Sequence, residues 1–327
     1  MKKIVLITIG GTIASISDDP MSTTNYHTPP LPGEVLLRMF DADEVLKGRI
    51  NVEVDDFMAM DSASLTPDHW LQLAKRTAEH LAKPDVDGAV ITHGTDTMEE
   101  SAYFLNLCVR SSKPVVFTGA MRPASAVSCD GGLNLFNAIA AAASGKLDGL
   151  GVTICMNGII VAAREARKIH PTRPDAFTPV EMGAIGCVTD GAVEIFYKST
   201  RKHTSNSDFD CCEIDSLPDV RIIYGYAGAP DDIFDHHVSC GAKGLVIAGV
   251  GNGNLSKSHL HKVRQLAKTL PIVRCTRANG FVNANGSQED CELGTFAGGN
   301  LSAQKARILL MFAIQSRKDI GQLFAEY

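Results

Sequence analysis

Long apolar runs and clustered basic residues are both missing from this sequence, and each absence removes a class of protein. No segment approaches the roughly 18 uninterrupted apolar residues that a membrane span needs. The formal net charge is −6, and lysine and arginine are scattered along the chain without a basic block. Neither nucleic acid nor an anionic membrane surface is therefore an expected partner. With 45% hydrophobic and 21% charged residues, the chain is typical of a soluble globular protein.

Motifs for metals and nucleotides are also missing. The nine cysteines are odd in number and include no CxxC pair, and Cys211 and Cys212 are too close together to act as a metal clip. We therefore expect reduced, structural thiols and no metal. The pattern GxxxxGK[ST] does not occur, and no convincing GxGxxG follows the first apolar run. No cofactor is expected.

Apolar runs alternate with helical patterns along the first two thirds of the chain. Runs apolar on both faces are typical of parallel strands covered by helices, and they lie at 2–9, 87–93, 113–119 and 149–157. Helical patterns lie at 66–83, 97–110 and 130–145. This alternation predicts an α/β class with a mainly parallel sheet flanked by helices.

The predicted helices carry start signals. Thr66 is a candidate N-cap followed by Pro67 at the first helical position. Thr97 and Glu100 have the spacing of a capping box. The third helix could begin on Asp130. Each signal predicts where a helix begins.

A polar stretch that has neither helical nor strand periodicity divides the chain. We predict an N-terminal catalytic α/β domain over 1–197, a linker over 198–218 and a smaller C-terminal parallel α/β domain over 219–327. In the second domain, apolar runs and helical patterns alternate again. The strands are expected at 220–227, 243–250 and 271–276, and the helices near 231–240, 255–269 and 302–315.

The first residues, "MKKIVLITIGG", imitate a secretion signal because two lysines precede an apolar run. That run is too short, contains Thr8 and ends at two glycines in place of a small-residue cleavage site. We interpret it as a first strand and expect a cytoplasmic protein.

Glycine and small polar residues follow several predicted strands, where ligands bind in open α/β sheets. These strand ends read "GGT" at 10–12, "HGTDT" at 93–97, "GAMRP" at 119–123 and "GVGNGN" at 249–254. Taken singly, each is more often a turn or a helix cap than a site. Two strand ends that each offer a threonine flanked by glycine, one followed by a carboxylate, indicate hydroxyl nucleophile chemistry.

These motifs resemble the bacterial L-asparaginase/glutaminase family over essentially the whole chain. They read "TIGGTIAS", "ITHGTDTMEE", "KPVVFTGAMRP", "AGVGNGNL" and "AQKAR". The resemblance implies an amidohydrolase in which a threonine attacks a side-chain amide, ammonia leaves and water releases the acid from an acyl-enzyme. It also implies a small-molecule amide substrate and a homo-oligomer, expected to be a tetramer of close dimers.

Carried over residue by residue, the resemblance places the nucleophile on Thr12. Gly10 and Gly11 would remove side chains where the substrate approaches the backbone. The second threonine, the aspartate and the lysine of the family fall on Thr95, Asp96 and Lys168. A partly desolvated lysine releases a proton more easily, which would let Thr95 position or activate water. Without the resemblance, Lys168 would be an ordinary surface lysine.

The other implied site residues concern closure and substrate recognition. Tyr26 falls at the place of a lid tyrosine that orients Thr12, and Ser62 at that of a serine holding the substrate α-carboxylate. Asp96 would also accept a bond from the α-amino group. Ala63 stands where the family has a glutamine or glutamate for that amino group. Two further positions would come from a neighbouring subunit, Asn254 and the approximate match Glu289.

Three functions stay open on the sequence. The first is an asparaginase, with or without glutaminase activity. The second is an amidase of the same fold for another small ω-amide, such as one lacking the α-amino group that Ala63 cannot bind. The third is a binding protein without turnover, which would not need Lys168.

Overall fold

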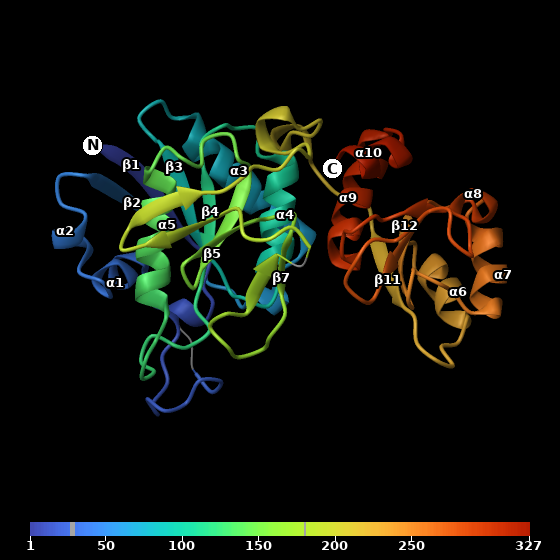
Figure 1. Ribbon diagram of the computed structural model, residues 1–327, viewed down its shortest axis with the longest axis horizontal. Helices are drawn as coiled ribbons and strands as arrows, with labels where there is room; N and C mark the ends of the chain where they lie inside the picture. Colours follow the sequence, from blue (N-terminus) through green and yellow to red (C-terminus); the bar gives the residue numbers. More distant parts are fainter. Residues whose placement is uncertain (27–29, 180) are drawn as a thin grey trace. The chain divides into compact units, whose positions relative to one another are not determined.

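The computed structural model describes residues 1–26, 30–179 and 181–327 and divides into two compact units, Met1–Glu213 and Ile214–Tyr327 (Figure 1). Most of the segment that the sequence marks as a linker is packed into the first unit. Phe209 and Cys211 in this segment are buried. Polar residues surround these two positions in the sequence, so the sequence pattern does not predict that they are buried.

An eight-stranded sheet forms the centre of the first unit. Its order is β10-β9-β6-β5-β4-β3-β1-β2. The five strands from β5 to β2 run parallel: β1 (Lys2–Thr8), β2 (Ile50–Asp56), β3 (Gly88–Thr92), β4 (Val115–Thr118) and β5 (Val152–Met156). The parallel core predicted from the apolar runs is thus confirmed, whereas β2 was not predicted.

The other three strands of this sheet are antiparallel, and the sequence analysis did not predict them. They are β6 (Ile159–Ala162), β9 (Gly186–Thr189) and β10 (Ala192–Ile195). A separate two-stranded ribbon pairs β7 (Ala166–Lys168) with β8 (Phe177–Pro179). All five are short, so none carries enough residues for a clear period.

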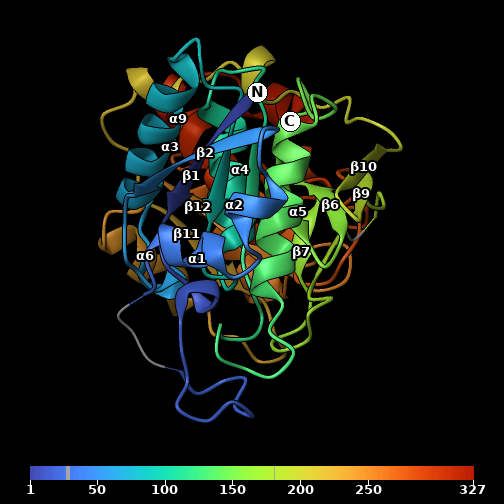
Figure 2. The ribbon, with the colours of Figure 1, turned by 90° about the vertical axis from the view of Figure 1, so that its left-hand side faces the viewer.

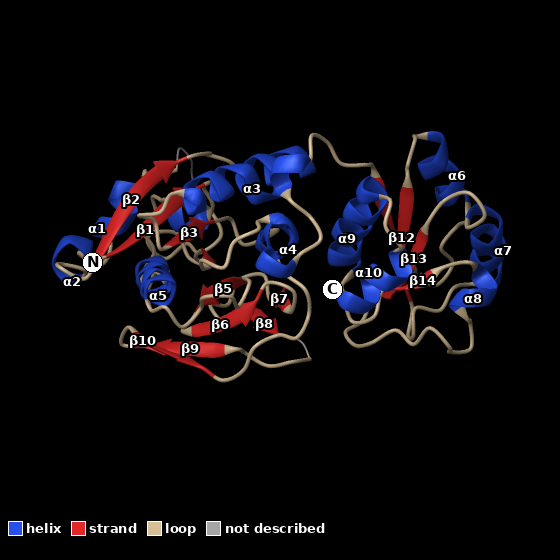
Figure 3. Ribbon diagram, turned by 90° about the horizontal axis from the view of Figure 1, so that it is seen from above, coloured by secondary structure: helices blue, strands red, loops and turns tan. Residues whose placement is uncertain are grey.

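Helices cover both faces of the large sheet. The longer ones are α3 (Pro67–Ala82), α4 (Met98–Cys108) and α5 (Gly131–Ala143), and the shorter ones α1 (Gly33–Arg38) and α2 (Ala42–Val45). Figure 3 shows α3 and α4 on one face and α5 on the other. In Figure 2, α1, α2 and α5 lie in front of the strands. The sheet is therefore the middle layer of three.

The helix starts differ in how their caps are made. The Thr66 side chain caps α3 by accepting from the His69 N–H, as predicted. The predicted capping box at Thr97 is wrong, because the Thr97 hydroxyl donates instead to the Ser62 carbonyl at 2.7 Å. α4 is thus tied to a neighbouring loop of the pocket described below.

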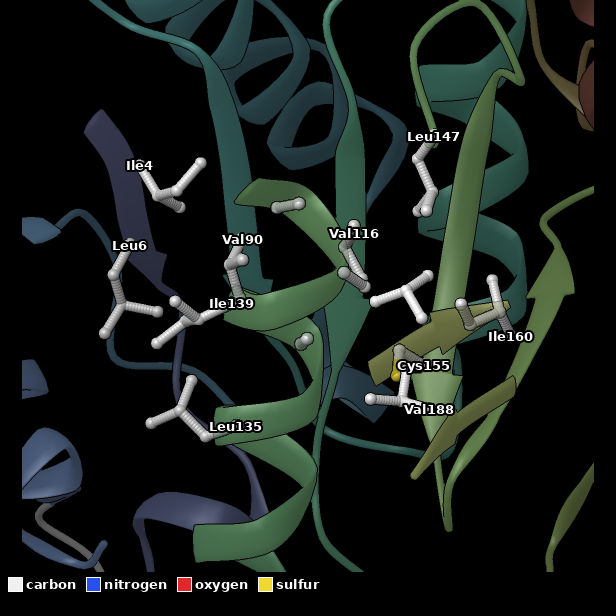
Figure 4. Packing of buried hydrophobic residues seen from close by; sticks show 14 of the residues in the cluster. Ile4, Leu6, Val90, Val116, Leu135, Ile139, Leu147, Cys155, Ile160 and Val188 are labelled. Atoms are coloured by element: carbon white, nitrogen blue, oxygen red, sulfur yellow. The ribbon is translucent and has the colours of Figure 1, made fainter. Parts of the chain in front are cut away.

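A large core cluster lies between the sheet and α5. Figure 4 shows Leu135 and Ile139 of α5 packed over the strand residues Leu6, Val90 and Val116. All five side chains are fully buried. Burying an aliphatic side chain of this size contributes about 1.5–3 kcal/mol, so this face fixes the strands whose ends carry the site.

The second unit is a smaller α/β layer structure, as predicted. Its parallel sheet has the order β11 (Val220–Tyr224), β12 (Gly244–Gly249), β13 (Ile272–Thr276) and β14 (Phe296–Ala297). Figure 3 shows its helices on both sides. They are α6 (Asp232–Ser239), α7 (Lys257–Leu266), α8 (Asp290–Leu293), α9 (Ala303–Ser316) and α10 (Ile320–Glu326). Among the described residues of both units, no helix has the length and apolarity to cross a bilayer.

Candidate active site

A cavity of about 830 Å³ opens at the carboxyl ends of β1, β2 and β3. The parallel register aligns these ends, with Thr8 beside both Asp56 and Thr92. The loops that follow therefore meet at one edge of the sheet. The cavity is lined by Gly10, Gly11, Thr12, Ser15, Tyr26, Pro30, Ala59, Met60, Asp61, Ser62, Gly94, Thr95 and Asp96.

Glycines let these three loops approach one another. Gly11 has a φ of +92°, and a Cβ there would lie 2.4 Å from the Gly94 nitrogen. A Cβ on Gly94 would lie 2.6 Å from the Ser62 hydroxyl oxygen. A Cβ on Gly10 would lie 2.7 Å from the Met60 carbonyl oxygen. The expectation that the substrate uses the space of the missing side chains at Gly10 and Gly11 is wrong, because neighbouring protein backbone occupies it.

Thr12 is the first residue of a short 3-10 turn, η1 (Thr12–Ala14), and is 8% exposed. Its hydroxyl donates to the Tyr26 phenol oxygen at 3.0 Å. Tyr26 lies on the loop after η1, which projects from the sheet in dark blue in Figure 1. The lid expected from the sequence spans 17–32, and its residues 27–29 lie outside the described residues. The hydroxyl of Thr12 is thus fixed in direction at the cavity wall.

Thr95, Asp96 and Lys168 form a second polar group. Lys168 Nζ donates to Thr95 Oγ1 at 2.9 Å and to Asp96 Oδ1 at 2.5 Å. The Lys168 side chain is only 14% exposed, which separates it from an ordinary surface lysine. Because the ammonium donates to Thr95, the Thr95 hydroxyl hydrogen stays available for a bond into the cavity.

Lys168 ends β7, a strand that the sequence analysis missed, and α4 holds it in place. Glu99, in the first turn of α4, accepts a bond from the Lys168 backbone N–H at 2.7 Å. Helix α4 begins directly after the Thr95 loop. The same helix start therefore presents Thr95 and Asp96 and anchors the strand that brings in Lys168.

His93 lies directly before the Thr95 loop and holds it in position. It is fully buried, with Nδ1 2.6 Å from the Gly94 carbonyl and Nε2 2.7 Å from the Ser101 hydroxyl. A carbonyl can only accept, so Nδ1 carries the proton and Nε2 accepts from Ser101. Burial lowers the pKa of His93 to about 4. The His93 ring is thus neutral, and its two hydrogen bonds hold the Thr95 loop in position.

Of the residues expected to bind the α-carboxylate and α-amino groups of the substrate, some line the cavity and others do not. Ser62 is buried and lines the cavity at the start of the 3-10 turn η2 (Ser62–Ser64). Ala63 is exposed and is not among the lining residues. Asp61, which the sequence analysis did not single out, lines the cavity. No motif identifies it, because its position depends on the η2 turn, which its carboxylate caps by accepting from the Ala63 N–H.

Asn254 and Glu289 lie in the second unit. Asn254 pairs with Val250 through two backbone bonds, and its Oδ1 is buried without a hydrogen-bond partner among the described residues. The buried Arg274 donates to the Gly253 carbonyl and pairs with Asp290 at 2.7 Å. This network holds the glycine-rich loop that presents Asn254. Glu289 is the N-cap residue of α8.

Fold and site together define a class: a two-unit α/β protein whose larger sheet carries hydroxyl, carboxylate and ammonium groups around one cavity at its carboxyl edge, as in many enzymes with parallel sheets. Sequence comparison gives the family. Residues 3–201 match the N-terminal asparaginase domain, and residues 219–324 match the glutaminase/asparaginase C-terminal domain. The chain belongs to the asparaginase family.

Individual relatives match along the full length. The chain is 40% identical to L-asparaginase 2 of Bacillus subtilis over 334 residues, covering 100% of this chain and 87% of that protein. It is 37% identical to the glutaminase-asparaginase of Acinetobacter glutaminasificans, with 99% of both chains covered. Among solved structures, a probable cytoplasmic L-asparaginase from Campylobacter jejuni superposes with a TM-score of 0.94 at 36% identity, with both chains fully covered.

Proposed function

We propose that this enzyme hydrolyses the side-chain amide of L-asparagine to L-aspartate and ammonia. One observation carries the proposal. The Thr12–Tyr26 pair and the Thr95–Lys168–Asp96 group contribute to a single cavity, lined by all of them except Lys168. A chain that only bound an amide would not need this half-buried lysine.

In the first half-reaction, Thr12 Oγ1 attacks the amide carbon and its proton leaves towards Tyr26, to which the hydroxyl already donates. The carbon–nitrogen bond breaks, and the departing nitrogen takes up the proton that Tyr26 passes on from Thr12 and leaves as ammonia. The N-terminal end of α4 stabilises negative charge that develops near Thr95. The product is an acyl ester on Thr12.

In the second half-reaction, water attacks the ester carbon. Thr95 orients this water through the hydroxyl hydrogen that its bond from Lys168 leaves available. Asp96 balances the Lys168 charge through the 2.5 Å ion pair. The ester bond breaks, aspartate is released and Thr12 regains its proton.

Ser62, Asp61 and Asp96 would hold the α-carboxylate and the α-ammonium group of the substrate. Ser62 donates to the α-carboxylate, while Asp61 and Asp96 accept from the α-ammonium. Asn254 and Glu289 would complete the site from a neighbouring subunit of a tetramer of close dimers. A cytoplasmic location is supported by nine free thiols and by the Campylobacter relative described as probably cytoplasmic.

Ammonia release over a panel of small amides tests the proposal. We expect asparagine to be hydrolysed with a higher kcat/KM than glutamine or succinamate. Glutamine is included because a relative is named a glutaminase-asparaginase. Preference for succinamate would favour the other amidase function, and no turnover of any amide would favour a binding protein. Subcellular fractionation tests the location.

A further inference from the structure

A second cluster of reactive side chains lies in the first unit, away from the proposed active site. One ligand atom each from Asp210, Cys211 and Cys212 lies within 4.8 Å of the other two. Cys211 and Cys212 begin the 3-10 turn η4 (Cys211–Glu213). Across residues 1–26, 30–179 and 181–327, no other set of three His, Cys, Asp or Glu side chains comes together in this way.

The turn and a neighbouring helix hold this cluster in place. The Asp210 carboxylate accepts from the Cys212 N–H at 2.9 Å, which fixes the carboxylate beside the two thiols. Cys211 is fully buried and lies near Cys108, the last residue of α4, whose thiol donates to the Phe104 carbonyl at 3.3 Å. Cys212 is exposed. The cluster thus has a rigid inner side and an outer side open to solvent.

These donors match the needs of a soft divalent cation. Zinc binds thiolate sulfur at about 2.3 Å and carboxylate oxygen at about 2.0–2.2 Å in a tetrahedron, so its ligand atoms lie about 3.5–3.8 Å apart. The three atoms lie close enough to reach that spacing by small side-chain rotations. Thiolate ligands favour Zn²⁺ and similar soft ions over Mg²⁺ or Ca²⁺.

We propose that Asp210, Cys211 and Cys212 form a binding site for a thiophilic divalent cation of the Zn²⁺ type. The site is separate from the reaction: α4 spans 11 residues, or about 16 Å, between the Thr95 loop and Cys108. A bound cation would stabilise the conformation of the η4 turn, because the three ligands are consecutive residues at the start of that turn. This departs from the expectation that adjacent cysteines cannot form a metal clip, because the turn adds Asp210 as a third donor.

Cadmium titration of the reduced, metal-free enzyme tests this site. Thiolate–Cd²⁺ bonds give a charge-transfer absorbance in the ultraviolet, and a phosphine reductant keeps the thiols free without binding the ion strongly. We expect one Cd²⁺ per chain and displacement by Zn²⁺. Because Cys212 is exposed, Cys212→Ser should fold normally and weaken binding at least about tenfold. Asp210→Asn should weaken it similarly.

Cys129→Ser and Cys291→Ser are matched controls, since both cysteines are exposed and lie outside the cluster. They should leave the stoichiometry and the affinity unchanged. Ammonia release should be the same with and without the ion. The proposal is overturned if Cd²⁺ does not bind, if Cys212→Ser and Asp210→Asn bind it as the wild type does, or if either control removes it.

Discussion

At the residue scale, the two threonine hydroxyls make the sharpest prediction. Thr12→Ala and Thr95→Val should fold normally and lose at least about a thousandfold in kcat, because each removes a hydroxyl that acts in the reaction. Thr269→Ala, an exposed threonine of the second unit, is the control and should keep full activity. Steady-state ammonia release measures all three. A Thr12→Ala enzyme with most of its activity would contradict the nucleophile assignment.

Asp61 and Ala63 make competing predictions about substrate choice. If the Asp61 carboxylate binds the α-ammonium, Asp61→Asn should lower kcat/KM for asparagine about tenfold relative to succinamate, because a bond to a charged group weakens. Ala63→Gln should then change little. Both ratios come from the same ammonia assay.

The opposite pattern would support the sequence-based interpretation of Ala63. In that pattern, the wild type hardly distinguishes asparagine from succinamate and Ala63→Gln gains selectivity by about tenfold to a hundredfold. The sequence identified Thr12, Thr95 and Asp96 because short motifs hold them next to glycine. It could not identify Asp61, whose role depends on how η2 turns beside two other loops.

At the element scale, the close packing of strand-end loops makes Gly11 irreplaceable. Gly11→Ala should lower both the free energy of unfolding and kcat/KM, the latter at least about a hundredfold. A Cβ there would force the Gly94 backbone, and with it Thr95, out of position.

Gly48→Ala is the matched control for this substitution. Its φ is +70°, but nothing lies within 4 Å of an added Cβ, so it should cost only the backbone strain of about 1–2 kcal/mol and leave kcat/KM unchanged. Urea unfolding and ammonia release separate the two effects. Equal losses in both variants would mean that strain alone, and not the loop contact, accounts for Gly11.

The elements differ in how far the sequence reveals them. Strands β1, β3 and β4 are continuous apolar runs because helices cover both faces, so their pattern is unmistakable. β7 has three residues and is fixed by the Glu99 carboxylate, a contact 69 positions away. Family resemblance therefore predicts the role of Lys168, and only the fold explains why its side chain is half-buried.

At the scale of the whole molecule, His93 couples stability to pH. Its pKa is lowered to about 4 by burial, while an unfolded histidine titrates near 6.5. As the pH falls below 6.5, the unfolded state takes up a proton that the folded state refuses, so stability falls until about pH 4. From pH 7 to pH 5 the loss from His93 is about 2 kcal/mol.

Comparison with His93→Asn isolates this contribution. The free energy of unfolding should fall by about 2 kcal/mol less between pH 7 and pH 5 in the variant than in the wild type. Other groups titrate alike in both proteins and cancel. An equal fall would mean that the folded protein protonates His93 in place.

The last prediction concerns assembly. It follows from the proposal that Asn254 acts in the site of a neighbouring subunit. Asn254→Ala should lose at least about a hundredfold in kcat/KM. Thr12→Ala should be inactive because it lacks the nucleophilic hydroxyl. In a two-fold dimer of one subunit of each kind, the Asn254→Ala subunit keeps its Thr12 and receives a wild-type Asn254 from its partner, so one site is complete.

Coexpression of the two variants should therefore restore activity that neither has alone. Random pairing makes about half of the dimers mixed, each with one complete site of two, which gives about a quarter of wild-type activity. Affinity tags of two kinds isolate the mixed species, and light scattering gives its mass. If Asn254 served the site of its own chain, each mixed dimer would hold one site without Thr12 and one without Asn254, and coexpression would restore nothing.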